Sequence, residues 1–529
     1  MTGTLSLIRL ALRRDRLLLA AWILLIVGMT AATASAIAEL YPGMAQRVAL
    51  GVTIGSTPAL QALTGPVYDA TSVGGLTAWR ATTLVTVLVA LMSLFTVTRH
   101  TRAEEESGRA ELIGACPVGR QAIPAAAIIV AAGANLLIAL LLTAALTELG
   151  LPVASALAFG LAIAATGWVF TAVAAVTSQL TEHAKSANAL AVAVLGLAFL
   201  LRAGGDAAGI EALSWISPLG WAQRVRAFAG DRWWVIGLTV LVALLLGAIA
   251  AALARRRDLG SGVLPSRAGP AAAPPYLNSP LALAWRLHRG SLLAWSAGFA
   301  VAGGLFGALA QSVGEILRDN AQLAQILQRL GGAQALIDTF LAAQTGLLGL
   351  VAGGYAVQAV LRLQAEEATS RAEPVLAAAV PRRQWTLSHL IMAFGGAAMI
   401  LSVGGLTEGL AHGTRASDIG RQVVRLLGAV WVQVPAVWVT AGLAMLLYGA
   451  LPQLTALAWA ALVAFALLGQ LGEVLRLPEW LQRVSPYAHL PQMPGGELDA
   501  VPLLWLTALA LTLATAGTTA FARRDLIGT

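Results

Sequence analysis

The sequence predicts an all-α integral membrane protein with about twelve transmembrane helices, arranged as two parallel six-helix repeats. The first observation is composition, because 58% of the 529 residues are hydrophobic and only 11% are charged. Soluble domains carry roughly 25% charged residues, so water cannot be the main solvent of this chain. The second observation is the number of long apolar stretches. The third is a set of short charged motifs that occurs twice.

A helix that crosses a bilayer needs about 20 mainly apolar residues. The expected spans in the first half are 17–38, 81–98, 122–147, 153–178, 187–203 and 233–254. Those in the second half are 291–314, 341–361, 386–411, 426–448, 453–472 and 501–522. Residues 17–38 resemble a signal peptide, but the pattern Arg13…Trp22 recurs internally as Arg286…Trp295. We therefore expect this first segment to be a retained span.

Matched motifs define the repeat. Residues 103–111, Ala-Glu-Glu-Glu-Ser-Gly-Arg-Ala-Glu, are followed 262 positions later by 365–373, Ala-Glu-Glu-Ala-Thr-Ser-Arg-Ala-Glu. We call them the first and second acidic cassettes. Arg-Arg-Asp-Leu likewise occurs at 256–259 and at 523–526. An even number of spans per half makes the repeats parallel. We expect a first six-helix half at 1–254, a cytoplasmic Gly/Pro/Ala-rich linker at 255–280 and a second six-helix half at 281–529.

The distribution of basic residues predicts orientation. Arginine clusters adjoin the spans on one side of the membrane, at Arg13, Arg14 and Arg16, at Arg255–Arg257 and at Arg523 and Arg524. By the positive-inside rule this side is the cytoplasm, so both termini are expected there. The net charge of +8 is therefore interpreted as a topology signal, and no nucleic-acid partner is expected.

The sequence contains no pattern for catalysis. A phosphate-binding P-loop needs two glycines and a lysine at fixed spacing, and the only lysine, Lys185, lacks both glycines. No His/Cys cluster has metal-ligand spacing, and no nucleophile elbow occurs. We expect no catalytic residues, no metal site and no cofactor in this chain.

The acidic cassettes are the candidate docking elements for a partner. Their charged residues have the spacing of a short surface helix, in which Glu-to-Arg pairs four residues apart add a few tenths of a kcal/mol. A solvated helix cap is the alternative, but it would not explain why the charges are duplicated. The candidate docking residues are Glu104, Glu105, Arg109 and Glu111, with Glu366, Glu367, Arg371 and Glu373.

Intramembrane polar residues are candidates for a substrate path. Glu148 and Glu408 are expected at the outer ends of matched spans, either receiving cationic substrates or facing outer water. Asn135, Gln358 and Gln433 could line a cavity, although amide contacts between helices explain them equally well.

Taken together, the six-span halves, the Arg-bearing first segment and the charged segment between spans 2 and 3 resemble permease subunits of type-2 ABC exporters. The fused duplication and the cassettes resemble in particular actinobacterial permeases for polyketide and ionophore antibiotics of the tetronasin type. The resemblance implies that residues 99–120 and 362–384 are coupling helices seated in two copies of a separate ATPase, which would bind ATP and Mg. It also implies a bacterial cytoplasmic membrane and a hydrophobic or amphipathic small-molecule substrate. The second cassette departs from the first at Ala368 and is followed by Pro374, so the two docking sites need not be equivalent.

Two other classes remain. A secondary drug–proton antiporter often has twelve spans in two halves, but it needs protonatable groups buried in the membrane, whereas the acidic residues here fall in loops and at span ends. A membrane-bound lipid enzyme lacks a catalytic constellation in this sequence.

Overall fold

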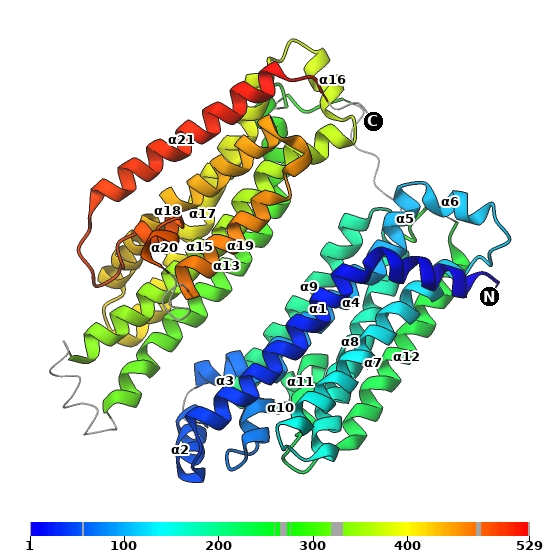
Figure 1. The fold of residues 1–529 in the computed structure, drawn as a ribbon, viewed down its shortest axis with the longest axis vertical. Coiled ribbons are helices and arrows are strands. Elements are labelled where there is room, and N and C mark those ends of the chain that lie inside the picture. Colours follow the sequence, from blue (N-terminus) through cyan, green and yellow to red (C-terminus); the bar gives the residue numbers. More distant parts are fainter. Residues whose placement is uncertain are drawn as a thin grey trace. The chain divides into compact units, whose positions relative to one another are not determined.

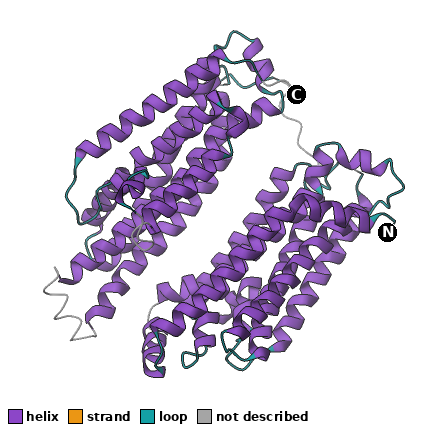
Figure 2. Cartoon of the chain, in the orientation of Figure 1, coloured by secondary structure: helices purple, strands orange, loops and turns teal. Residues whose placement is uncertain are grey.

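The computed structural model describes residues 2–526 apart from 56–57, 259, 265–271, 276, 319–331 and 472–477. Across these residues all regular structure is helical (Figure 2). The chain divides into two compact units, Met1–Gly269 and Pro270–Thr529. This boundary falls inside the expected linker, part of which lies outside the described residues.

The first unit is a bundle of long helices with shorter helices at their ends (Figure 1). The long helices are α1 (Thr4–Leu40), α4 (Val73–His100), α7 (Ala122–Glu148), α8 (Val153–Leu180), α9 (Ala184–Ala208) and α12 (Trp233–Arg256). The short ones are α2 (Met44–Gly55), α3 (Pro58–Thr64), α5 (Arg102–Glu106), α6 (Arg109–Gly114), α10 (Glu211–Ile216) and α11 (Pro218–Arg224).

Helix α8 is the centre of the first unit, where it packs against α4, α7 and α12, while α1 packs on α7. Its sequence explains this position, because alanine and glycine let neighbouring backbones approach closely. A side chain at Gly160 would meet the carbonyl oxygen of Ala139 in α7 at 2.5 Å. Such contacts are expected where packing, and not water exclusion, holds helices together.

The second unit has the same pattern of helix pairing. Its long helices are α13 (Pro280–Arg318), α15 (Gly332–Ala368), α17 (Arg382–Ala416), α18 (Ile419–Ala450) and α21 (Ala500–Arg523). Shorter elements are α16 (Ala372–Ala377), η1 (Pro452–Leu454), α19 (Leu457–Leu471), α20 (Glu479–Gln482) and η2 (Pro486–His489). Helix α18 packs against α15, α17 and α21, and α13 packs on α17. In each unit, therefore, the fourth long helix contacts the second, third and last ones.

Eleven helices of the described residues are long and apolar enough to cross a membrane, so the expected multi-pass helical class is confirmed. The remaining expected span, 453–472, is the shorter apolar helix α19. Its 15 residues extend about 22 Å, less than the roughly 30 Å hydrocarbon core. The first helix is longer than its expected span, because α1 begins at Thr4 and includes the arginine cluster.

Candidate functional site

Both acidic cassettes fold as a helix end, a left-handed residue and a second short helix. In the first cassette Gly108, at φ 72°, separates α5 from α6. In the second cassette Ser370, at φ 53°, separates α15 from α16. These two residues occupy matched positions of the repeat. The expectation of one continuous surface helix was wrong, because the turn interrupts the spacing that would place Glu105 beside Arg109 and Glu367 beside Arg371.

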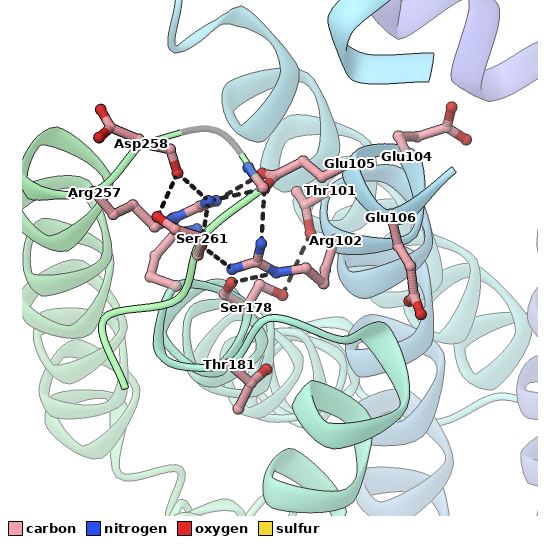
Figure 3. A network of polar contacts seen from close by, with 12 residues as sticks. Thr101, Arg102, Glu104, Glu105, Glu106, Ser178, Thr181, Arg257, Asp258 and Ser261 are labelled. Carbon is pink, nitrogen blue, oxygen red and sulfur yellow. Dashed lines mark hydrogen bonds and ion pairs between the residues drawn. The ribbon is translucent and has the colours of Figure 1, made fainter. Parts of the chain in front are cut away.

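The second glutamate of the first cassette is bound to the end of the last helix of its unit (Figure 3). Arg257 donates from Nη2 to Oε1 of Glu105 at 2.6 Å and from Nη1 to Oε2 at 2.8 Å. Both side chains are more than nine-tenths buried. We call this bidentate pair the first lock.

The second unit contains the equivalent pair. Arg524, directly after α21, donates from Nη1 to Oε1 of Glu367 at 2.8 Å and from Nη2 to Oε2 at 2.7 Å. The hydroxyl of Tyr448 in α18 donates a third hydrogen bond to Oε2 at 2.7 Å. This arrangement is the second lock. The two duplicated motifs, cassette and Arg-Arg-Asp-Leu, are therefore contact partners within each unit.

A planar guanidinium that faces a carboxylate through two parallel hydrogen bonds is a strong and directional contact. Removing one partner of such a buried pair costs about 3–5 kcal/mol, because the other charge is left uncompensated. Each lock therefore fixes the cassette to the last helix of its unit.

Arg102 extends the first lock to α8 and to the chain that follows α12 (Figure 3). Its side chain is fully buried and donates to Glu105 Oε2 at 2.8 Å, to the Ser178 carbonyl at 3.1 Å and to the Ser261 carbonyl at 2.8 Å. The amide of Val263 donates to the carbonyl of Gln179 at 3.0 Å, so this segment runs along the end of α8. The cassette, the fourth long helix and the last one thus meet in one polar network.

The first glutamate of each cassette is also engaged within its own unit. Glu104 pairs with Arg14 of α1, and Arg109 lies 3.9 Å away. Glu366 accepts a hydrogen bond from Arg362 Nε at 2.9 Å. Four of the eight candidate docking residues are therefore mainly buried and bonded inside the protein.

The other four candidate docking residues are exposed: Arg109, Glu111, Arg371 and Glu373. They lie on or beside α6 and α16, after the left-handed turn. Leu112 of α6 is 74% exposed and adds apolar surface to this group. Each cassette therefore has an inner part that is bonded to the bundle and an outer part that is accessible to a partner.

Two of the candidate path residues lie between helices. Asn135 is fully buried in α7 and donates to Ser93 Oγ of α4 at 3.0 Å. Gln433 in α18 is 5% exposed and packs against Gly349 of α15. These positions match the alternative in which the amides serve contacts between helices.

The remaining path candidates differ in exposure. Glu148 is exposed at the end of α7, and Gln358 is exposed on α15, where its Oε1 accepts from Trp295 Nε1 at 2.9 Å. Glu408, by contrast, has no exposed surface, and neither carboxylate oxygen has a hydrogen-bond partner. Of the two alternatives for Glu408, the one in which it faces outer water was wrong, because the side chain is buried and α17 continues two turns beyond it to Ala416.

Where residues are described, no three His, Cys, Asp or Glu side chains are grouped so as to hold a metal ion. The site is thus a pair of charged junctions that are held by ion pairs, and each has an exposed part.

The fold and these junctions define an all-helical multi-pass membrane protein. Residues 277–522 match the family model described as "Multidrug efflux system permease Rv1217c, C-terminal domain". The chain is 44% identical over 525 residues to "Multidrug efflux system permease protein Rv1217c" of Mycobacterium tuberculosis. The aligned region covers 99% of this chain and 95% of that relative. The chain therefore belongs to this family of multidrug efflux system permeases.

Proposed function

We propose that this chain is the membrane permease subunit of an ATP-driven exporter that moves hydrophobic or amphipathic, drug-like molecules out of a bacterial cell. The name of the Mycobacterium tuberculosis relative supports drug efflux. The sequence has no P-loop, so in this proposal ATP is bound and hydrolysed by another chain. The observation that carries the proposal is the lock, because it occurs at matched positions of both units.

In this proposal two copies of an ABC ATPase, with ATP and Mg, bind the exposed parts of the two cassettes on the cytoplasmic side. Closure of the ATPases pushes on α6 and α16. Because Glu105 is bonded to Arg257, and Glu367 to Arg524, each push passes to the last long helix of its unit. In the first unit Arg102 passes it to α8 as well. A rigid connection is what force transmission requires, since a flexible loop would absorb the movement.

The protein is assigned to the cytoplasmic membrane with both termini in the cytoplasm. The arginine clusters at the ends of α1, α12 and α21 support this orientation. It places both cassettes where ATP is available.

The test is charge reversal on the exposed part of the cassettes. The double variant E111R/E373R, expressed with an affinity tag in the native host, should lose the ATPase activity that co-purifies with the wild-type protein. Its melting temperature should be unchanged, because both side chains are exposed. The control is E148R, an exposed glutamate in a different part of the first unit. Wild-type protein that brings down no ATPase activity from native membranes would refute the proposal.

The second candidate is a drug–proton antiporter, and Glu408 is the observation that favours it. A carboxylate with no exposed surface and no partner is costly when ionised, so it is suited to binding a proton. Transport by the purified chain in vesicles decides between the two. An antiporter works without an ATPase, stops when a protonophore is added and is inactivated by Glu408→Gln.

A further inference from the structure

The first unit contains an apolar cavity of about 660 Å³. Residues of α1, α4 and α9 form its walls, including Met29, Leu84, Val87, Val192 and Phe199. Leu63 and Thr64, at the end of α3, close one side. Its size lies within the roughly 300–1,000 Å³ of small-molecule sites.

The hydroxyl groups of this cavity are already used by the protein. Thr33 donates to the Met29 carbonyl at 2.8 Å and Thr64 to the Leu60 carbonyl at 2.8 Å. Thr83 donates to the Thr64 carbonyl at 3.0 Å. A molecule in the cavity therefore meets apolar surface and few free donors.

Arg80 is the charged residue of the lining. It lies near the start of α4, and its guanidinium is 6.0 Å from the ring centroid of Trp79. Within the described part of the chain it forms no ion pair, and its side chain is exposed. Arg202 stacks on the ring of Phe199, a residue of the cavity lining, but its charge is paired with Asp206 at 3.5 Å. One uncompensated positive charge thus stands at the edge of an apolar cavity.

The second unit has an apolar cavity of about 400 Å³ between α13 and α15, and it is not charged. Trp295 is its polar lining residue, and the indole N–H is already bonded to Gln358. Among the described residues, each unit therefore has an apolar cavity, and the first of these cavities has a cation in its lining whereas the second does not.

We propose that the cavity of the first unit binds an amphipathic anion, with the apolar body between α1, α4 and α9 and a single acidic group on Arg80. The inference deepens the proposed function, on which it rests, by naming the substrate class. A charge-assisted hydrogen bond to a guanidinium is the interaction that would select the acid over a neutral analogue.

The experiment is photolabelling of the full-length protein in phosphatidylcholine nanodiscs with a diazirine-bearing fatty acid and with its methyl ester. The labelled peptides are mapped by mass spectrometry. For the wild type, half-maximal labelling of α4 and α9 should need about tenfold less acid than ester, the factor expected for one charge-assisted hydrogen bond. In Arg80→Gln the acid and the ester should reach half-maximal labelling at the same concentration. Arg80→Lys should keep part of the preference for the acid.

Two variants serve as controls. Arg421→Gln removes an exposed arginine of the second unit and should leave the preference intact. Gly196→Leu adds bulk where a Cβ meets no atom within 4 Å, so it should fill the cavity and weaken labelling by acid and ester alike.

Equal labelling by acid and ester in the wild type would overturn the inference. Loss of acid labelling when phosphatidylglycerol is added to the nanodiscs would also overturn it, because Arg80 would then be an anchor for lipid headgroups. ATPase co-purification is measured separately on the wild type. If no ATPase co-purifies but the preference for the acid is preserved, ATP-driven export is refuted and the anion site is not. If the ATPase co-purifies but the preference for the acid is absent, only the anion site is refuted.

Discussion

Arg257 and Glu105 are 152 residues apart in sequence and joined by two hydrogen bonds of 2.6 and 2.8 Å. The pair is asymmetric, because Arg102 also donates to Glu105. Loss of the glutamate leaves two buried arginines facing each other, whereas loss of Arg257 leaves a complete Arg102–Glu105 pair.

We therefore expect Glu105→Gln to lower the free energy of unfolding by about 3–5 kcal/mol, the cost of stranding buried charge. Arg257→Gln should cost less, about 1–3 kcal/mol for the lost charged hydrogen bonds. The destabilisation of each variant is measured by thermal unfolding, with the folded fraction at each temperature determined by size-exclusion chromatography. Glu111→Gln, on the exposed part of the same cassette, is the control. Equal melting of all three variants would mean that the lock contributes nothing to stability.

The contact between α18 and α21 gives a second prediction. A Cβ at Gly449 would lie 2.1 Å from the Gly517 carbonyl oxygen, whereas a Cβ at Gly428 of the same helix meets nothing within 4 Å. Gly449→Ala should destabilise the protein by about 1–3 kcal/mol through overpacking. Gly428→Ala should raise stability slightly, because alanine is the better helix former. A melting curve for each variant suffices, and shifts of the same sign would contradict the described helix contact.

The loop before α4 gives a prediction for pH. Burial raises the pKa of Asp69, but hydrogen bonds from the Ser72 and Thr71 side chains and backbones outweigh this effect and hold the pKa below its usual value. Ser72 in turn caps α4 by accepting from the Gly75 amide at 2.9 Å. Because the folded pKa is depressed, the stabilisation is present at neutral pH and is lost as the pH falls through the folded value, below about 4. The melting temperature of wild type should exceed that of Asp69→Asn at pH 6, and the difference should shrink below pH 4. A difference that is constant with pH would argue against this role.

Asn135 gives a prediction that separates packing from transport. Its amide is bonded to Ser93 between two long helices, so Asn135→Ala should cost about 0.6–1 kcal/mol of stability. The apparent affinity for an exported dye should not change. Glu148→Gln, at an exposed position at the end of the same helix, should leave stability unchanged. A change in dye affinity without a change in melting would instead make Asn135 a path residue.

Much of the architecture could be predicted from apolar length alone, because a helix that crosses lipid must satisfy its backbone internally. Span ends were harder to predict. Residues 4–16 contain arginines and Asp15, charges that are rare inside a transmembrane segment, yet they belong to α1. Asp15 is tolerated because it is buried against His100 Nε2 at 2.5 Å. The sequence contains no local signal for such a long-range partner.

The cassettes show that motif comparison does not predict which duplicated motifs contact each other. The matched glutamates and the matched Arg-Arg-Asp-Leu ends were both visible in the sequence, and their opposite charges were a signal that could have joined them. Their contact depends on the helices bringing residues 105 and 257, or 367 and 524, to the same end of a bundle. The left-handed turn at Ser370 was also hidden, since serine is a rare residue in that conformation.

Each lock takes both of its partners from one compact unit. Severing the peptide between Leu264 and Ser279 would consequently leave every ion pair of the two junctions unbroken. Two half-length polypeptides, synthesised from separate genes, would each complete their own polar framework before meeting. Because the tether carries none of these ion pairs, we expect each half to form its junction without a covalent link to the other.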